Sequence, residues 1–233
     1  MTVLMATIAR DVLVTGGTGY IGQRLVNHLA ARGHRVRVLA RRTALARVPA
    51  MATAVEGDAL NAASVASALR PGDTIVHLVG TPHPNPSKAA EFERVDLASI
   101  RATTEAARQV APAHIVYVSV AHPAPMMHAY IAVRTAGEES VSAVGCSATI
   151  VRPWYVLGPG HWWPVVLIPV YAIARMIPKT RDGATRLGLV TVTDMVWTLV
   201  GAVEHPPTSG AQILSVPDIK AWGRRGPLEV RSP

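Results

Sequence analysis

The sequence predicts an α/β fold, a doubly wound parallel sheet, and three observations lead to this prediction. Short apolar runs alternate with segments of helical periodicity from Asp11 to Val151. The first apolar run ends in a cluster of glycines that opens directly into a helical pattern. With 233 residues, of which 49% are hydrophobic and 16% charged, the chain is long enough for one good core and too short for two full domains.

The strands of the predicted sheet are short runs rich in apolar and β-branched residues. Several are apolar throughout, which is typical of parallel strands that are covered on both faces. The predicted strands are Asp11–Thr15, Arg35–Ala40, Thr53–Glu56, Thr74–Val79, His114–Val120 and Ala148–Val151.

Helices are predicted between these strands. Ile21, Leu25 and Leu29 recur at a spacing of four, which makes the apolar face of a first helix, and Gly33 follows as its stop. Asn61 is a suitable N-cap for a short helix. The further predicted helices are Asn61–Leu69, Glu91–Val110 and His128–Val144.

The pattern changes after Trp154, where a Gly-Pro-Gly turn precedes a strongly apolar stretch. The predicted elements are an apolar helix over Trp163–Ile177, a strand over Leu187–Val192, a helix over Asp194–Val203 capped by Thr193, and a last strand over Ala211–Val216. We expect residues 1–160 to form the sheet domain, 161–220 a small C-terminal substrate lobe packed on it, and 221–233 a loose tail.

Composition argues against several classes of function. The net charge is +8, but the arginines are scattered and form no aromatic-interleaved basic stripe, so we expect no nucleic-acid partner. A single cysteine, Cys146, suits a reducing compartment and predicts a cytoplasmic protein. The nine histidines are dispersed, so no metal site is expected.

One segment, 162–178, is apolar enough to raise the question of a membrane. Pro164, Pro169 and Arg175 interrupt it, and it is shorter than the ~20 residues of a spanning helix, so no transmembrane segment is expected. The N-terminus has no signal-peptide pattern. The first interpretation of 162–178 is a buried core helix, and the alternative is peripheral contact with a partner, a lipophilic substrate or a membrane surface.

The glycine cluster has the spacing Gly16-x-x-Gly19-x-x-Gly22 between a strand and a helix. The first glycine permits the tight turn, the second lets the backbone approach a pyrophosphate, and the third lets helix and strand pack closely. Phosphates then meet free amides at the positive end of the helix. The sequence therefore predicts a Rossmann-type dinucleotide site with contacts from Gly16, Thr18, Gly19, Tyr20, Ile21 and Gly22.

The second strand ends in Leu39-Ala40-Arg41-Arg42, without the carboxylate that would pair with ribose hydroxyls. Arginine matches a phosphate in bidentate fashion, so Arg41 and Arg42 favour NADP over NAD, with NAD still possible. The alternative is that both are solvated surface arginines.

With Thr15 before the glycines and Tyr20-Ile21 among them, the stretch resembles the extended and atypical short-chain dehydrogenases/reductases, which include epimerase/dehydratase-like and NmrA-like NAD(P)-binding proteins. The resemblance runs from Asp11 to Gly160. It covers the Gly-Asp turn after the third strand, the end of the fourth strand and the Arg-Pro segment after the sixth. It implies cofactor contacts by Asp58, Ala59, Leu78, Val79, Gly80, Pro153 and Tyr155.

The same resemblance implies a catalytic Tyr-x-x-x-Lys on the helix after the fifth strand, where Tyr130 and Arg134 stand. It implies that Tyr130 transfers a proton and that position 134 holds the ribose, although arginine replaces the family's lysine. Ser119 matches one position of the family's serine pair, whereas Ala121 lacks a hydroxyl at the other, which leaves Ser119 or His122 as substitutes.

These features predict an NADP(H)-binding oxidoreductase of the atypical short-chain type that acts on a small apolar carbonyl or hydroxyl substrate, with Tyr130, Arg134 and Ser119 as its catalytic residues. Two alternatives stay open. Because of Arg134 and Ala121, the chain is alternatively a non-catalytic NAD(P)H sensor or assembly factor. Epimerase or dehydratase chemistry would use the same residues.

Overall fold

The structure is a computed structural model that describes residues 8–160, 166, 174 and 176–229. Its centre is a seven-stranded sheet in the order β3-β2-β1-β4-β5-β6-β9, in which every neighbouring pair is parallel. The strands are β1 Asp11–Thr15, β2 Arg35–Ala40, β3 Thr53–Glu56, β4 Thr74–His77, β5 His114–Val118, β6 Ser147–Val151 and β9 Ala211–Leu214. The order steps outward in both directions from β1 and β4, which confirms the predicted doubly wound fold.

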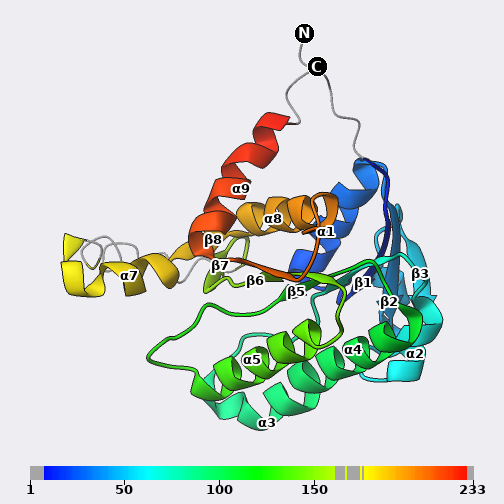
Figure 1. The fold of residues 1–233 in the computed structure, drawn as a ribbon, viewed down its shortest axis with the longest axis horizontal. Helices are drawn as coiled ribbons and strands as arrows, with labels where there is room; N and C mark the ends of the chain where they lie inside the picture. The colour runs from blue at the N-terminus through cyan, green and yellow to red at the C-terminus, as the bar shows by residue number, and fades with distance from the viewer. Residues whose placement is uncertain (1–7, 161–165, 167–173, 175, 230–233) are drawn as a thin grey trace.

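Helices cover both faces of this sheet (Figure 1). One face carries α1 Tyr20–Ala31, α8 Val192–Glu204 and α9 Val216–Glu229, and the other carries α2 Ala62–Ala68, α4 Ala98–Val110 and α5 His128–Ser142. Each face has its own core: Leu25 and Leu29 of α1 are fully buried on the first, and Ile100 of α4 is fully buried on the second. The predicted apolar face of the first helix is thereby confirmed.

Two predicted helix ends are confirmed and one is corrected. The side chain of Asn61 accepts a hydrogen bond from the Ser64 amide at 3.0 Å, and Gly33 adopts a positive φ of 86° after α1. The cap of α8 is Thr191 rather than Thr193, because β8 (Leu189–Thr191) leads directly into the helix. Thr191 and Asp194 form a capping box in which each side chain accepts from the other residue's amide, at 3.0 and 2.9 Å.

The helix predicted over Glu91–Val110 is a composite. The turn η2 (Pro86–Lys88) and the short helix α3 (Ala89–Glu91) precede a π-helical turn, η3 (Phe92–Leu97), which runs into α4. Phe92 and Asp96 are both buried in η3. Such π turns insert one extra residue into a helix and occur frequently at functional sites.

The region after β6 differs from the predicted division of the chain. The described residues between 176 and 220 belong largely to the sheet domain rather than to a small lobe packed on it, because β9 pairs with β6 in the main sheet and α8 packs on α1. Outside the sheet stand α7 (Pro178–Arg186), which projects from the body in Figure 1, and a two-stranded parallel ribbon of β7 (Tyr155–Leu157) and β8.

The tail expected to be loose over 221–233 is helical as far as Glu229, and residues 230–233 lie outside the described part. The helix α9 is held because Trp222 fills the space above Gly201 in α8, where an added Cβ would lie 2.5 Å from the ring. Ile219, one turn earlier, is fully buried. These apolar contacts outweigh the charge and proline that suggested disorder.

Most of the predicted apolar helix over 163–177 lies outside the described residues, so that prediction is not tested. Three described apolar side chains of the segment are exposed: Val166 by 72%, Met176 by 78% and Ile177 by 48%. Within the described part of the chain, no helix combines the length and the apolar character that crossing a bilayer takes.

Candidate dinucleotide site and proton-transfer site

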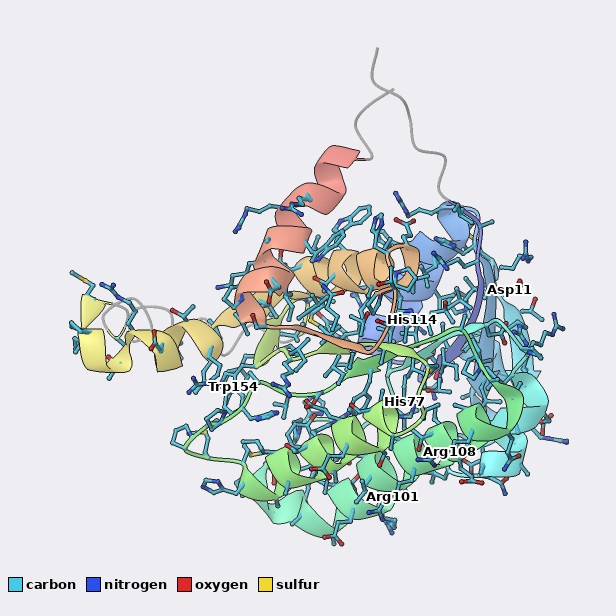
Figure 2. The ribbon with its side chains drawn as sticks, viewed as in Figure 1. Asp11, His77, Arg101, Arg108, His114 and Trp154 are labelled. Carbon is cyan, nitrogen blue, oxygen red and sulfur yellow. The ribbon has the colours of Figure 1, made fainter. Side chains whose placement is uncertain are left out.

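The candidate site lies along the carboxyl ends of the strands, where open α/β sheets bind ligands. Two of the strands end earlier than the sequence predicted. β4 stops at His77 and β5 at Val118, so Leu78–Gly80 and Ser119–Ala121 leave the sheet as loops at this edge. Figure 2 places His77 in the middle of the molecule and Trp154, just beyond β6, towards α7.

The glycine loop has the geometry that its spacing predicts. Gly16 has a φ of 79°, and a Cβ there would lie 2.8 Å from the backbone of Leu78. The amide of Gly19 donates to the carbonyl of Gly16 at 3.0 Å, which closes the turn. A Cβ on Gly22 would collide with the same carbonyl. The loop therefore tolerates no side chain at Gly16 or Gly22.

The start of α1 fits the phosphates of a dinucleotide. Its N-cap is Gly19, which has no side chain to cap the helix and is exposed. The first turn of α1 contains no acidic residue, so no carboxylate of this turn competes with a phosphate for the positive end of the helix. Thr18 and Ile21 flank this turn and are half-buried, as residues that border a bound nucleotide would be.

Arg41 and Arg42 both follow β2 and are exposed, but they differ in their partners. Arg42 donates to Glu56 of β3 at 2.9 Å, across the edge of the sheet. Arg41 forms no ion pair with any described residue. Of the two arginines predicted to favour a 2′-phosphate, Arg41 is therefore the one whose charge is not already balanced by a described carboxylate.

The Gly-Asp turn after β3 lies next to the end of β2, because the Gly57 amide donates to the carbonyl of Ala40 at 3.0 Å. Asp58 is exposed, and its side chain accepts from the Leu60 amide at 3.0 Å, which fixes the turn that carries Ala59. The structure thus brings the predicted adenosine-side residues to one edge, and their contact with adenine stays a prediction.

Tyr130 and Arg134 share one face of α5, as the spacing predicted. The guanidinium carbon of Arg134 lies 5.1 Å from the centre of the half-buried Tyr130 ring, and the ring of Phe92 lies 4.9 Å from it on another side. Arg134 is itself buried. Burial by itself lowers the pKa of Arg134. Its interactions with Tyr130, Tyr117 and Asp96 raise that pKa by more than burial lowers it, so the net shift is upward and the guanidinium stays charged.

Arg134 is bound by its own protein. Its Nη2 donates to Oδ1 of Asp96 at 2.6 Å, and its Nη1 donates to the carbonyl of Val118 at 2.9 Å. The other oxygen of Asp96 accepts from the amide and the hydroxyl of Thr81, at 2.9 and 2.6 Å. The guanidinium passes so close to Gly80 that a Cβ there would collide with it. The predicted contact of Arg134 with ribose stays a prediction.

His77 of β4 is a buried histidine that links the sheet to α4. It lies within hydrogen-bond distance of the hydroxyls of Thr15 (2.9 Å), Ser99 (3.2 Å) and Thr103 (3.1 Å). Burial, together with the nearby charge of Arg134, lowers the pKa of His77 to about 3. It is therefore neutral at pH 7 and has a structural role.

Ser119 and Ala121 lie beside the end of β6, because their amides donate to Val151 and Pro153 at 2.8 Å each. The Ser119 hydroxyl is buried and has no hydrogen-bond partner among the described residues. Ala121 supplies no hydroxyl there. An unpartnered buried hydroxyl at this edge is suited to meet a substrate oxygen.

His122 lies 3.6 Å from Glu138 of α5 through its Nε2. Glu138 also accepts hydrogen bonds from Nε and Nη2 of Arg152, which follows β6. Pro153 and Tyr155, the predicted nicotinamide-side residues, follow directly on this segment, and Trp154 packs on Tyr155 with ring centres 5.6 Å apart.

Sequence reasoning missed Asp96, Thr81 and Phe92. The only signal for Asp96 was an acidic residue at a position that would be buried in a regular amphipathic helix. No group of three metal-binding side chains occurs among the described residues.

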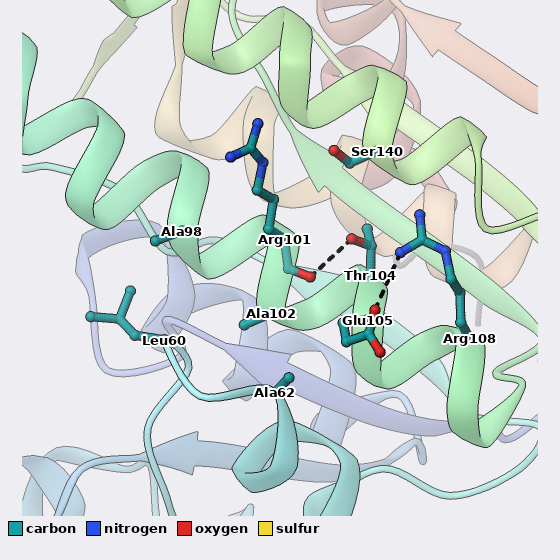
Figure 3. Close-up of a pocket in the computed structure, with 9 residues that line it drawn as sticks. All are labelled: Leu60, Ala62, Ala98, Arg101, Ala102, Thr104, Glu105, Arg108 and Ser140. Atoms are coloured by element: carbon teal, nitrogen blue, oxygen red, sulfur yellow. Dashed lines mark hydrogen bonds and ion pairs between the residues drawn. The ribbon is translucent and has the colours of Figure 1, made fainter.

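A cavity of about 540 Å³ lies between α2, α4 and α5 (Figure 3). It is lined by Arg101, Glu105 and Arg108 of α4 together with small side chains such as Ala62. Leu60, which directly follows the predicted cofactor contacts Asp58 and Ala59, also lines it.

A doubly wound sheet, a glycine cradle before α1 and a tyrosine paired with a cation on α5 define a nucleotide-binding Rossmann protein of the short-chain dehydrogenase/reductase type. The comparisons narrow this class. The chain belongs to the NAD dependent epimerase/dehydratase family, whose model matches residues 12–215.

Two curated proteins are similar in sequence. A ceramide reductase from Caulobacter vibrioides is 32% identical over 205 residues, which cover 87% of this chain and 64% of that protein. The chain therefore spans just under two thirds of the length of this relative. A 3-beta-hydroxysteroid dehydrogenase from Mycolicibacterium neoaurum is 44% identical over 66 residues, 28% of this chain and 18% of that protein.

Solved structures share the fold. MoeE5 in complex with UDP-glucuronic acid and NAD superimposes with a TM-score of 0.66 at 23% identity, covering 92% of this chain and 81% of that one. WbmH from Bordetella bronchiseptica in complex with NAD+ gives 0.66 at 22% identity, covering 89% and 76%. The predicted family and Rossmann fold are thus confirmed, and a nucleotide cofactor is supported.

Proposed function

We propose that the chain is an NADP(H)-dependent oxidoreductase that interconverts a carbonyl and a hydroxyl group on a rather apolar substrate. The observation that carries this proposal is the Tyr130–Arg134 pair. The guanidinium passes Gly80, in the same loop as Leu78, whose backbone packs on Gly16 of the glycine cradle. The names of the two curated relatives describe oxidoreductases of lipid substrates, which supports the apolar character of the substrate.

In the proposed reaction, the bound nicotinamide supplies or accepts the hydride. Tyr130 holds the proton that passes to the carbonyl oxygen during reduction, or receives it during oxidation. The unpartnered Ser119 hydroxyl donates a hydrogen bond to the same oxygen and orients it. Arg134 provides a fixed positive charge next to the phenol ring, which stabilises the phenolate that remains after proton donation.

Preference for NADP rests on Arg41. It is exposed, forms no ion pair with the described residues, and follows the strand whose end borders the adenosine ribose in this fold. Arg42 supports the same phosphate only when it leaves Glu56. The predicted cytoplasmic location stays a prediction.

The exposed side chains of Val166, Met176 and Ile177 support the proposal of an apolar contact near α7. The contact would be with a lipophilic substrate or the membrane that carries it. Arg186 of α7 donates to the carbonyl of Pro123 at 3.1 Å, which places α7 beside the loop that follows Ser119 and His122. An apolar substrate would thus reach the site past this helix.

The experiment is to follow NADPH oxidation by purified protein with a panel of aldehydes, ketones and long-chain keto-lipids. Substrate-dependent oxidation that disappears in Tyr130→Phe supports the proposal. A matched control is Ser140→Ala, which alters the same helix away from the site and is expected to keep full activity. Turnover in Tyr130→Phe equal to that of the unaltered chain would remove Tyr130 from the mechanism.

A second candidate function is a nucleotide-binding sensor or assembly factor without catalysis. The observations that favour it are the arginine at position 134, already bound to Asp96, and the missing hydroxyl at Ala121. It predicts nucleotide binding without oxidation of NADPH by any carbonyl. Epimerase or dehydratase activity, the third candidate, predicts conversion of a nucleotide sugar without net consumption of the cofactor.

A further inference from the structure

Asp96 and Arg134 form a buried ion pair inside the candidate site. The Asp96 side chain is 1% exposed and that of Arg134 is 7% exposed. Both carboxylate oxygens are used, one by Arg134 and the other by the amide and hydroxyl of Thr81. A carboxylate whose two oxygens both accept hydrogen bonds is held in one orientation.

The groups around the guanidinium come from four elements. Tyr130 lies on α5, Asp96 on η3, and Tyr117 and the Val118 carbonyl on β5. The charge of Arg134 also contributes to the lowered pKa of His77 on β4. His77 is neutral at pH 7, and both tyrosines are neutral while they keep their protons. Asp96 is therefore the anion in contact with Arg134 that balances its charge.

The element that carries Asp96 is the π-helical turn η3. Phe92 and Asp96 lie in the same turn, and both face α5: the ring of Phe92 packs against Tyr130, and Asp96 binds Arg134. One irregular turn thus contacts both the tyrosine and the cation of the pair. Gly80 leaves the space through which the guanidinium passes.

We propose that Asp96 is a positioning residue for Tyr130 that acts through Arg134: it fixes the guanidinium against the phenol ring and balances its charge. This rests on the proposed function in that Tyr130 is the proton donor of the reaction. With Asp96 in place, Arg134 stabilises the phenolate formed in turnover. Without Asp96, an unbalanced cation would lie 5.1 Å from the ring centre and favour the phenolate at rest.

Two substitutions should move the ionisation of Tyr130 in opposite directions. Asp96→Asn leaves the cation unbalanced, so the phenol should lose its proton at a pH lower by about one unit. Arg134→Gln leaves the Asp96 carboxylate unbalanced, so the phenol should lose its proton at a higher pH. The double variant Asp96→Asn/Arg134→Gln removes both charges and keeps both shapes, so its titration should lie between those of the single variants.

The chain offers a matched control in a second buried ion pair. Asp73 binds Arg37 at 2.5 Å, with side chains 1% and 9% exposed, and it precedes β4 at the opposite edge of the sheet. Asp73→Asn removes a carboxylate of the same burial and is expected to lower stability. It should not change the titration of Tyr130.

The measurement is a pH titration of the full chain labelled with ¹³Cζ-tyrosine, read by NMR, with Tyr130→Phe to assign the signal. Opposite shifts in Asp96→Asn and Arg134→Gln, and none in Asp73→Asn, are the expected result. An unchanged Tyr130 signal in both single variants, or an equal shift in Asp73→Asn, would overturn the proposal. If Asp96→Asn does not fold, Arg134→Gln and the double variant still test the direction.

The titration needs neither substrate nor turnover, so it separates this proposal from the proposed function. If the Tyr130 titration shifts in opposite directions in the two variants, but the chain oxidises NADPH with no carbonyl substrate, the proposed oxidoreductase function is contradicted and the proposed role of Asp96 is retained. In an active chain, the pH–rate profile for kcat should move with the NMR midpoint, whereas the KM for NADPH should stay within about threefold.

Discussion

The guanidinium carbon of Arg134 lies 5.1 Å from the centre of the Tyr130 ring, one helical turn away on the same face of α5. Because the phenol is the half-buried polar group of this pair, its removal should affect proton transfer and little else. We predict that Tyr130→Phe lowers kcat by about 10²- to 10⁴-fold. NADPH affinity, measured by fluorescence titration, should change by less than about threefold. A parallel loss of affinity would instead give Tyr130 a binding role.

Arg41 should discriminate between the two nicotinamide cofactors. Charge-assisted hydrogen bonds contribute about 1.5–3 kcal/mol, so Arg41→Ala should weaken NADPH binding by roughly 10- to 100-fold and leave NADH binding nearly unchanged. Arg42→Ala should have a smaller effect, because Arg42 is already paired with Glu56. Arg224→Ala, at an exposed arginine of α9, is the control for net charge. If Arg41→Ala weakened NADH binding as much as NADPH binding, Arg41 would not act through the 2′-phosphate.

The glycine cradle should be intolerant of a single methyl group. A Cβ at Gly22 would collide with the Gly16 carbonyl and lie 2.7 Å from the Cα of Gly17, so Gly22→Ala must displace the loop. We expect loss of measurable NADPH binding by calorimetry, with the far-UV circular dichroism retained. Gly183→Ala is the matched control, because nothing lies within 4 Å of its added Cβ. Nucleotide binding by Gly22→Ala at the unaltered strength would contradict the close packing of loop against helix.

Two buried histidines should make the fold sensitive to mild acid. Burial lowers the pKa of His77 to about 3, and burial with the nearby Arg10 lowers that of His114 to about 4. Between these values and pH 6.5 the unfolded chain binds protons that the folded chain does not, so stability falls as the pH decreases through this window and is insensitive to these groups above it.

Each neutral histidine should contribute up to about 1.4 kcal/mol of lost stability per pH unit in that window. Urea unfolding at pH 7.5, 6 and 5 measures this slope. His77→Asn keeps a polar group next to Thr15 and Ser99. It should lower the loss of stability per pH unit by the contribution of one histidine. The same slope in the variant would show that His77 is protonated in the folded state.

The sequence predicted what depends on local pattern. The strands, the glycine cradle and the Tyr130–Arg134 face follow from spacings of seven residues or fewer, which set backbone conformation directly. The further residues that the family resemblance implied lie at the carboxyl edge of the sheet in the structure, and their contact with a cofactor stays a prediction.

What the sequence did not predict depends on tertiary contacts. Asp96 and Arg134 are 38 residues apart, and Asp96 lies in a π turn that no periodicity signals. The last helix was missed for a related reason. Charge and proline after Trp222 suggested disorder, whereas the ring of Trp222 packs on Gly201, a contact visible only once α8 and α9 are placed together.

The central claim, a dinucleotide site at the Gly16–Gly22 turn with a preference for NADP, is tested most directly by titrating the purified chain with NADPH and with NADH by calorimetry, alongside Gly22→Ala. The account predicts saturable binding of one nucleotide per chain, at least about tenfold tighter for NADPH, and none in Gly22→Ala. Absence of binding by the unaltered chain, or equal binding by Gly22→Ala, would contradict it.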